Sequence, residues 1–556
     1  MRSLPEAGFA LLLVVVYGWV FPFFPRLNNP NELVRVYMAR SIAEDSTYSI
    51  GTRSQGPDGS WVDTGPVYDE WGFVNDKALV CSEPGEHPPH CAGRLYAAKA
   101  PAASFFAVPV VGALDAAVRV FAHRAPTKGE FVFVLRWMLG ILPTIAFWLS
   151  IRRFLLALGI SMAVTTVACL AGALGSASLT YGQMFAGHQL SAVSLGLLFL
   201  AAFWPRQAPA ASRGASDLRA LLVGFGAASA ACSEYQAAPA ALLLFFGWLL
   251  YERPPRSAVG WALVGALPLL LVTARFHAVV FGAPWRTPYA ALENAKFIQD
   301  FGTAPLGLRW PSWEGTSGSL LSARLGLLFW APWMVLLLPS IDLLLRRAPQ
   351  GEPPTHKEAR RIGRLACLLV AYYVVFQICH ALWQSGWTVG PRYMTPVAPF
   401  AAVAIAIALE LAHLDARRWL LGVFAGTAAA AILVTGLVSL LCQGFPTEVA
   451  QPLVEVVGPL LRHGFVARNP LQALGVPGVA SAVPTLLGLA VAVWVCLRSA
   501  GPGFTVPVRL ACAVFLLVVG LQWTWPKGAN PAGEDAAAFL AEHWEPALPP
   551  GARPFE

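Results

Sequence analysis

Lys99 stands at the edge of an apolar segment, where a charged side chain is costly and therefore informative. It lies in the stretch "RLYAAKAPAASFF", directly before Ala100 and Pro101. A lysine in this place either snorkels and anchors the following segment at the membrane surface, or neutralises an anionic group that approaches from the lipid. At about 4 Å and an effective dielectric constant near 20, that attraction is worth roughly 4 kcal/mol. Small residues around Pro101 leave room for a headgroup, so we predict an anion-binding role for Lys99.

A carboxylate, Glu32, occupies a similar place in the stretch "NNPNELVRVYMARSI". We expect Asn31 to cap a short helix in which Glu32 and Arg35 share one face. The helix macrodipole favours a carboxylate in the first turn. Glu32 is therefore either a helix-capping residue or a group that acts on a substrate at the membrane surface.

Four more ionisable residues lie near the ends of apolar runs. His188, in "YGQMFAGHQLSA", is by default a hydrogen-bonded packing residue. Glu234, in "ACSEYQA", needs a cationic partner, which Arg275 or Arg392 could supply. Arg392 lies in the turn "WTVGPRYMTP", where a planar guanidinium suits a phosphate or a carboxylate. We take His188, Glu234 and Arg275 as candidates for lining a cavity, and Arg392 as a second anion-binding group.

Two cysteines, Cys81 and Cys91, bracket the polar stretch "SEPGEHPPH". In an oxidising compartment such a pair most often forms a disulfide, which we favour here. A metal site would use both cysteines with His87 and His90, but the adjacent His90 and Cys91 are awkward co-ligands. Nearby acidic residues could bind a divalent cation, although their spacing defines no site. We therefore predict no metal centre and no cofactor.

The whole chain has the composition of a polytopic membrane protein. It is 56% hydrophobic and 13% charged over 556 residues, and a soluble chain of this length needs more charge to cover its surface. We expect an all-α bundle of about 13 transmembrane helices. They are predicted near residues 8–25, 131–151, 159–180, 189–205, 219–235, 237–252, 257–279, 323–345, 363–383, 394–413, 418–442, 477–497 and 504–524.

The formal net charge of +8 resembles that of a nucleic-acid-binding protein until its distribution is considered. With the N-terminus placed in the cytoplasm, the lysines and arginines gather in alternate connections, while the short connections on the opposite side carry almost none. This is the pattern of the positive-inside rule. The charge therefore reflects membrane topology, and we expect no nucleic-acid partner.

The topology requires that the apolar segment after Lys99 does not cross the membrane. It is apolar for only about 15 residues before Asp115, Arg119 and Arg124, which favours an interfacial or re-entrant helix. The predicted parts are then a first transmembrane helix (1–25), a large outer loop with interfacial helices (26–130), transmembrane helices 2–7 (131–279), an outer loop (280–322), transmembrane helices 8–13 (323–525) and a loosely ordered outer tail (526–556).

These features together resemble the GT-C superfamily of glycosyltransferases that use polyprenyl-phosphate sugars. The resemblance rests on a first helix followed by an Asn-Glu dipeptide, on a long outer loop and on the element Tyr-x-x-Lys-Ala-Pro. It is closest to the bacterial aminoarabinose-transferase and mannosyltransferase-like branch. It implies a GT-C-like bundle, with Glu32 as the carboxylate that acts on the acceptor and Lys99 near the lipid phosphate.

One departure from the family pattern concerns that carboxylate. Relatives often carry a paired Asp-Glu, where this chain has Asn31 and Glu32. Asp69, Glu70 and Asp76 in the outer loop are therefore alternative catalytic carboxylates.

The resemblance implies transfer of a sugar from a polyprenyl-phosphate donor to an envelope acceptor, which could be a glycan, a lipid or a protein. Glu32 would act as the general base, while Lys99 and Arg392 would stabilise the departing phosphate. The chain would lie among the lipids of a bacterial inner membrane, with a periplasmic active site. Two alternatives remain, a flippase or transporter of lipid-linked sugars and a non-catalytic scaffold of envelope assembly. A transporter would move substrate without making product.

Overall fold

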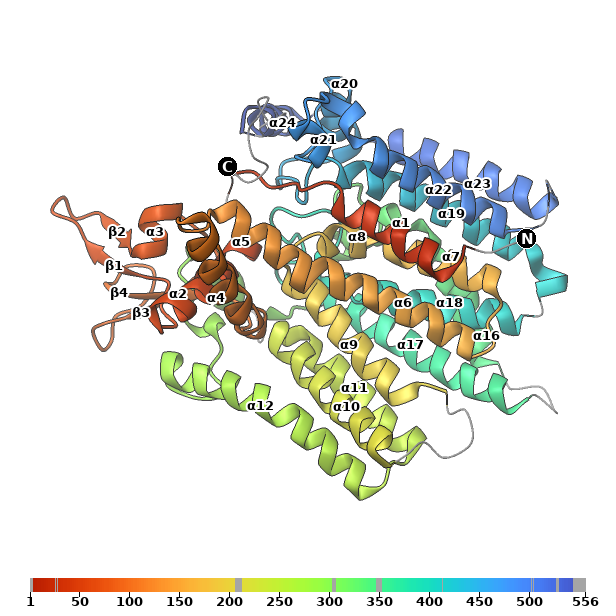
Figure 1. Cartoon of the computed structure of the whole chain (residues 1–556), viewed down its shortest axis with the longest axis horizontal. Coiled ribbons are helices and arrows are strands. Elements are labelled where there is room, and N and C mark those ends of the chain that lie inside the picture. The colour runs from red at the N-terminus through yellow and green to blue at the C-terminus, as the bar shows by residue number, and fades with distance from the viewer. Residues whose placement is uncertain are drawn as a thin grey trace.

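The computed structural model describes residues 4–25, 27, 29–205, 213–302, 307–346, 353–412, 414–501, 503, 505–526 and 530–543. Long helices run alongside one another for most of the chain, and one small sheet projects from one end of the bundle (Figure 1). The predicted class, a helical polytopic membrane protein, is confirmed.

Within the described residues, seven helices are long and apolar enough to cross a membrane: Ala102–Ala122, Lys128–Ala157, Arg256–Phe281, Pro354–Cys379, Arg418–Ser439, Gly478–Ser499 and Val506–Trp523. Five shorter apolar helices accompany them: Glu6–Gly18, Met162–Leu174, Gly187–Phe203, Pro332–Leu345 and Val397–Leu411. A short helix spans a bilayer less completely than a 20-residue one, so its ends need support from neighbouring protein.

Each predicted span coincides with helical structure. The bundle consists of α1 (Glu6–Gly18), α5 (Lys128–Leu135), η1 (Arg136–Ile141), α6 (Leu142–Ala157), α7 (Met162–Leu174), α8 (Ala177–Gly182), α9 (Gly187–Phe203), α10 (Arg213–Ser233), η2 (Tyr235–Ala237), α11 (Ala238–Glu252), α12 (Arg256–Phe281), α15 (Leu327–Trp330), η5 (Pro332–Leu336), α16 (Leu337–Leu345), α17 (Pro354–Cys379), η6 (Arg392–Met394), α18 (Val397–Leu411), α19 (Leu414–Ser439), α22 (Val483–Ser499) and α23 (Val506–Trp523).

The predicted span 323–345 is wrong as one continuous helix. α15 ends at Trp330, and Ala331 leaves helical geometry with φ −133° and ψ 64°. Pro332 then begins the 3₁₀ turn η5, and the α-helix resumes only at Leu337. Proline lacks the backbone N–H that a continuous helix needs, and it disfavours the helical conformation in the residue before it.

The core of the bundle forms around α18. All its residues from Val397 to Leu409 are buried, and it packs against α6, α7, α16, α17 and α19. Helix α12, by contrast, exposes Leu263, Leu267 and Leu271. α18 is apolar on every side, as expected of a central helix. The exposed leucines of α12 are suited to contact with lipid tails.

The segments between α1 and α5 gather at one end of the bundle, here called the loop end. They include α2 (Pro30–Asp45), α3 (Pro66–Trp71), α4 (Ala102–Ala122) and the sheet (Figure 1). Lys128 Nζ, at the start of α5, donates to the Pro25 carbonyl at 3.2 Å, so the two ends of this part of the chain meet. Helix α4 could cross a membrane by length and composition. Its interfacial placement stays a prediction.

The opposite end of the bundle carries the C-terminal ends of α6, α9, α16 and α22 (Figure 1). Arg152 and Arg153 lie on α6, Arg346 follows α16, and Arg498 lies on α22. Basic residues are thus present at the end remote from the sheet, as the topology prediction requires.

A four-stranded antiparallel sheet in the loop end is an addition to the predicted all-α architecture. Its order is β2-β1-β4-β3, from β1 (Gly51–Gln55), β2 (Trp61–Thr64), β3 (Lys77–Cys81) and β4 (Gly93–Ala97). Arg53 and Asp63 face each other across β1 and β2, and their side chains form an ion pair at 2.6 Å. The carboxylate of Asp63 also binds the buried Lys77 Nζ at 2.6 Å. These charges fix the register of strands too short to be specified by an apolar face.

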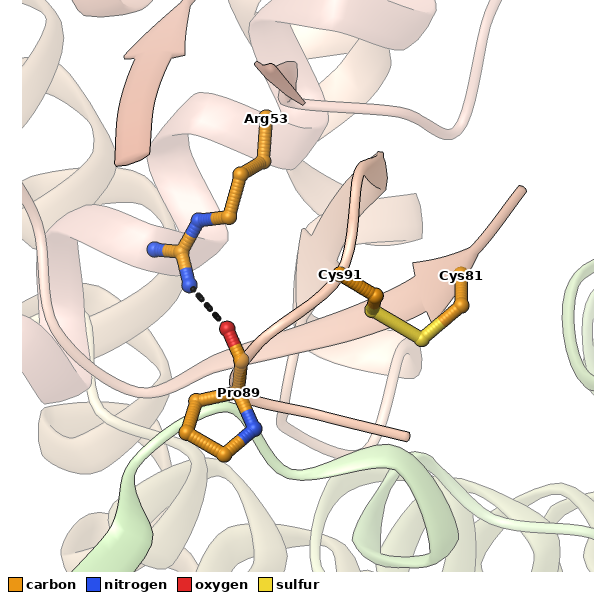
Figure 2. Close-up of a disulfide and its surroundings, with 4 residues drawn as sticks. All are labelled: Arg53, Cys81, Pro89 and Cys91. Atoms are coloured by element: carbon orange, nitrogen blue, oxygen red, sulfur yellow. Dashed lines mark hydrogen bonds between the residues drawn. A yellow bond between two sulfur atoms is a disulfide. The ribbon is translucent and has the colours of Figure 1, made fainter. Parts of the chain in front are cut away.

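A disulfide joins Cys81, at the end of β3, to Cys91, two residues before β4 (Figure 2). The loop between them is also held by Arg53, whose Nη1 donates to the Pro89 carbonyl at 3.2 Å (Figure 2). Because the two sulfurs bond each other, neither is a thiolate ligand for a metal.

The predicted loosely ordered tail is wrong for its first part. Residues Pro531–His543 form helix α24, and Leu540 is fully buried. Asn530 donates from its side chain to Glu448 O at 2.9 Å and to Glu455, which ties the start of α24 to the bundle. The alanines at 532 and 536–538 favour a helix. The rest of the predicted tail, 544–556, lies outside the described residues.

Candidate active site

Helix α2 begins at Pro30 and brings Asn31 and Glu32 to the loop end of the bundle. The cap is Asn29, not the predicted Asn31, since the Asn29 side chain accepts a hydrogen bond from the Asn31 N–H at 3.1 Å. Proline at the first helical position fits this assignment, because its missing N–H would have had no partner there. Asn31 and Glu32 are thereby inside the helix, with their side chains free for tertiary contacts.

Glu32 is held by three hydrogen bonds. Arg136 donates through Nε to Oε1 at 2.8 Å and through Nη2 to Oε2 at 2.7 Å, and the Phe185 N–H donates to Oε1 at 2.8 Å. Both side chains of the ion pair are almost fully buried. A bidentate pair of this kind fixes geometry as well as charge. In this arrangement Glu32 joins α2 to η1.

The second ion pair of α2 joins Arg35 to Glu234 at 2.7 Å. The expectation that Arg275 or Arg392 partners Glu234 is therefore wrong. Arg275 lies on the exposed side of α12, whereas Phe276 and His277 next to it are buried. Successive helix residues point about 100° apart, so one of them faces away when its neighbours face inward.

His188 lies beside the same ion pair. Its Nδ1 is 3.4 Å from Glu234 Oε1, and its ring packs edge-on against Tyr181 and Tyr393. The side chain is buried and does not line the cavity described next. His188 and Glu234 thus lie together, and Arg275 lies apart from them.

A cavity of about 1510 Å³ opens at the loop end. It is bounded by the start of α2, the segment before β3, η2, the loop after α12, the end of α17 and η6. Its polar lining includes Asn31, Glu32, Asp76, Lys99, Arg136, Tyr235, Tyr289, His380, Arg392 and Tyr393. Four of the predicted site residues, Glu32, Asp76, Lys99 and Arg392, therefore meet in one cavity.

Asp76 and Lys99 form an ion pair in the cavity wall, with Lys99 Nζ 3.0 Å from Asp76 Oδ2. The Ala98 N–H also donates to the Asp76 carbonyl at 2.8 Å, which holds the two segments together. Burial raises the pKa of the Asp76 carboxyl group, but the charges of Lys99 and Arg392 lower it by more, and the pKa lies below the ordinary aspartate value. Asp76 is therefore ionised at neutral pH.

Arg392 is a cation without a carboxylate partner among the described residues. Its Nη2 donates to the Tyr393 hydroxyl at 3.3 Å, and its guanidinium lies 5.1 Å from the centre of the Tyr393 ring. Its buried Nε has no hydrogen-bond partner. A guanidinium without a carboxylate partner is suited to binding an anion.

The other two carboxylates considered from the sequence lie outside the cavity. Asp69 accepts a hydrogen bond from the Gly65 N–H at the start of α3. Glu70, which is partly exposed, binds Arg40 at 2.6 Å. Both stabilise α3 and its contact with α2.

Sequence reasoning missed several residues of the site, among them Arg136, Tyr235 and Tyr289. Arg136 lies inside the apolar run "FVFVLRWMLG", and a lone arginine within a predicted span was a signal for a buried partner. Tyr235 and Tyr289 line the cavity from η2 and from the loop after α12. Nothing in their local sequence distinguishes them from interfacial aromatic residues.

In the described part of the chain, no group of three or more His, Cys, Asp and Glu side chains is arranged to hold a metal ion. The cavity lining supplies carboxylates, cations and hydroxyl groups.

Fold and site define a polytopic helical membrane protein with a cavity at one end that is lined by both cations and carboxylates. No protein-family model and no curated protein matches the chain. Among solved structures it is similar to ArnT from Cupriavidus metallidurans in the apo state, with 15% identity and a TM-score of 0.45, over 97% of this chain and 76% of that one. It is also similar to ArnT from the same organism bound to undecaprenyl phosphate, with 15% identity and a TM-score of 0.46, over 96% and 77% of the two chains. At this level of similarity, function has to be argued from the site.

Proposed function

We propose that this protein is a membrane glycosyltransferase that moves a sugar from a polyprenyl-phosphate donor to an envelope acceptor. The observation that carries the proposal is that one cavity holds two cations, Lys99 and Arg392. Among the described residues, Arg392 has no carboxylate partner and Lys99 pairs with Asp76 alone. A phosphate would give both cations an anionic ligand.

The walls of the cavity support a lipid-linked ligand. Beyond the charged residues the lining is largely apolar and includes Leu33, Leu308, Val375 and Phe376. Its volume of about 1510 Å³ exceeds what one sugar phosphate needs. The apolar part of the cavity would take isoprene units, while the charged part takes the phosphate.

The chemistry follows from which carboxylate is available. An acceptor hydroxyl must lose its proton as it attacks the anomeric carbon, and the bond from that carbon to the phosphate oxygen breaks. Glu32 was the predicted base, but its two oxygens already accept three hydrogen bonds. We assign this role to Asp76, which would lose its ion pair when Lys99 turns to the phosphate. General bases of this kind contribute about 10² to 10⁴ in rate.

Lys99 and Arg392 would stabilise the charge that gathers on the departing phosphate, a preorganised electrostatic role. The proposed setting is a bacterial inner membrane with the N-terminus in the cytoplasm and the cavity on the periplasmic side. The acceptor would be a glycan, a lipid or a protein reached from that side.

The experiment is transfer of radiolabelled sugar from a panel of undecaprenyl-phosphate sugars by the purified chain in lipid vesicles, with an envelope extract as the source of acceptors. Lys99→Ala and Arg392→Gln are compared with wild type. Arg119→Gln serves as the matched control, because Arg119 is exposed on α4, pairs with Asp115 and does not line the cavity.

We expect product from wild type and from the control, and at least a tenfold loss in both cavity variants, since each removes a charge-assisted contact. Movement of labelled lipid between leaflets without product would instead indicate a flippase. A chain that neither makes product nor moves lipid across an adequate panel would be a scaffold.

A further inference from the structure

Tyr235 and His277 form a hydrogen-bonded pair at the cavity wall. Tyr235 begins η2 and lines the cavity, and its hydroxyl lies 2.8 Å from His277 Nε2. His277 lies in the last turns of α12 and is buried between the rings of Phe276 and Phe281. The proposed transfer gives neither residue a role.

The direction of this hydrogen bond follows from the other side of the imidazole. His277 Nδ1 lies 3.0 Å from the Pro284 carbonyl oxygen, which can only accept, so Nδ1 carries the hydrogen. No carboxylate among the described residues pairs with His277, and an unpaired imidazolium buried to this degree would be costly. The ring is therefore neutral, Nε2 is an acceptor, and the Tyr235 hydroxyl donates to it.

Tyr235 lines the cavity, and its hydroxyl oxygen keeps lone pairs but has no free hydrogen. Such an oxygen cannot donate to a phosphate, and it would accept a hydrogen bond from a ligand hydroxyl. Because the Pro284 carbonyl keeps the hydrogen of His277 on Nδ1, the Tyr235 hydroxyl has to donate to Nε2. Tyr235 can then only accept a hydrogen bond from a ligand.

Tyr235 lies near the proposed phosphate position. Its ring is 5.8 Å from that of Tyr289, and the segment after Tyr289 reaches β3, where Leu292 pairs with Ala78, two residues after Asp76. Asp76 in turn binds Lys99. In a lipid-linked sugar, the sugar is joined directly to the phosphate. A sugar hydroxyl is therefore the hydrogen-bond donor expected near this part of the cavity wall.

We propose that Tyr235 accepts a hydrogen bond from a hydroxyl of the sugar that is joined to the lipid phosphate, and that His277 positions the Tyr235 hydroxyl for this contact. The inference rests on the proposed function for the identity of the ligand. It assigns a sugar subsite on the η2 side of the cavity, separate from the cations that take the phosphate.

Equilibrium binding of paired lipids to the purified chain tests this. The probes are undecaprenyl phosphate and the same lipid carrying glucose, mannose or 4-amino-4-deoxyarabinose. We expect Tyr235→Phe to weaken binding of the preferred sugar-bearing lipid by about tenfold, the upper range for one hydrogen bond. Binding of undecaprenyl phosphate itself should change by less than about twofold, since the lost hydroxyl cannot donate to it.

Two variants at His277 separate positioning from packing. His277→Leu removes both hydrogen bonds and should reproduce the selective loss. His277→Gln should restore most of the affinity, because its amide can donate to the Pro284 carbonyl and accept from Tyr235. Tyr48→Phe is the matched control, as the Tyr48 ring packs on Phe276 at 5.1 Å without lining the cavity.

The sugar subsite would be overturned if Tyr235→Phe lost equal affinity for the bare and the sugar-bearing lipid, or lost affinity for neither. A wild-type chain that binds no sugar-bearing lipid would overturn it as well. Because binding is measured without turnover, a wild-type chain that discriminates the lipids but makes no product would refute the proposed transfer and leave the subsite standing.

Discussion

Two carboxylates line the cavity, and their hydrogen-bond partners separate their roles. Glu32 is locked between Arg136 and the Phe185 N–H, whereas Asp76 has one side-chain partner, Lys99. A carboxylate held in a bidentate pair with an arginine is a poor proton acceptor. At the scale of single residues, we therefore infer a structural role for Glu32 and a catalytic role for Asp76.

We predict that Asp76→Asn lowers sugar transfer by about 10² to 10⁴ while thermal unfolding changes little, because the base is lost and the shape is kept. Glu32→Gln should destabilise the fold by about 3 kcal/mol, because it leaves Arg136 buried without its counter-charge. Transfer rates and unfolding of both variants in the same detergent measure this. A Glu32→Gln variant that is stable but inactive, beside an active Asp76→Asn variant, would return the role of base to Glu32.

The ion pair of Asp63 predicts a pH dependence of stability. Burial raises the pKa of Asp63, but hydrogen bonds from Arg53 and Lys77 lower it by more, so the folded-state pKa lies below the unfolded value of about 3.9. Its contribution is complete above about pH 4 and is lost as pH falls through the lower, folded-state pKa. Unfolding temperatures measured from pH 7 to pH 3 should therefore fall more steeply for wild type than for Asp63→Asn. Parallel curves would show that the pair adds no stability.

At the residue level, the sequence identified the cavity cations and carboxylates better than it identified their partners. Lys99 and Arg392 could be found because charges beside apolar runs are rare. The link from Glu234 to Arg35 spans 199 positions of the chain and depends on how α2 packs, which no local pattern records. Tyr235 and His277 belong to the same class, because a hydrogen bond between two segments has no local signature.

Among the elements, α2 is the one that the site depends on most. Two of its ion pairs attach it to η1 through Arg136 and to the end of α10 through Glu234, and a third joins it to α3 through Arg40 and Glu70. The first residue of α9, Gly187, lies against the second pair, where an added Cβ would overlap Glu234 Oε1 and Arg35 Nη2. Glycine is required there because these side-chain atoms lie so close to its Cα, and not because of its backbone conformation.

We predict that Gly187→Ala destabilises the protein by about 1 to 3 kcal/mol, because the overpacked methyl group forces the buried ion pair apart. Gly112→Ala in α4 is the control, since a Cβ at Gly112 meets no atom within 4 Å. An alanine inside a helix should stabilise it by about 0.5 to 1 kcal/mol. Thermal unfolding followed by tryptophan fluorescence measures both. Equal shifts in the two variants would mean that the ion pair tolerates the added group.

The helices with long apolar segments could be predicted from the sequence, whereas the strands of the sheet and helix α24 could not. Every predicted span coincides with a helix or a broken helix, because the bilayer sets a length that the sequence displays. Strands such as "GTRSQ" and "WVDT" were missed because they are short, polar and held by charge pairs instead of an apolar face. Helix α24 was missed because its alanine-rich sequence carries only a weak apolar pattern.

At the scale of the whole molecule, the cavity lies at one end of the bundle, and arginines at helix ends lie at the other. The helix ends remote from the sheet carry arginines, whereas the cavity opens at the loop end. If the positive-inside rule sets the orientation, the cavity faces away from the cytoplasm. The orientation depends on α4, because a crossing at α4 would reverse every later helix.

We predict that alkaline phosphatase inserted between residues 125 and 126 is active in cells, and that the same enzyme inserted after residue 157 is inactive. The enzyme folds only outside the cytoplasm, and α4 is expected to return to the side on which it began. Phosphatase activity normalised to fusion abundance is the measurement. An inactive insertion at 125 together with an active one after 157 would show that α4 crosses the membrane.

The affinity of the purified chain for undecaprenyl phosphate, set against undecaprenol, tests most directly whether this cavity holds a lipid phosphate. The two lipids share their isoprenoid chain and differ only in the charged group. We predict that wild type binds the phosphate at least about tenfold more tightly, and that Lys99→Ala and Arg392→Gln each remove most of this preference. Equal affinity for the two lipids, or a preference that survives in both variants, would contradict the account.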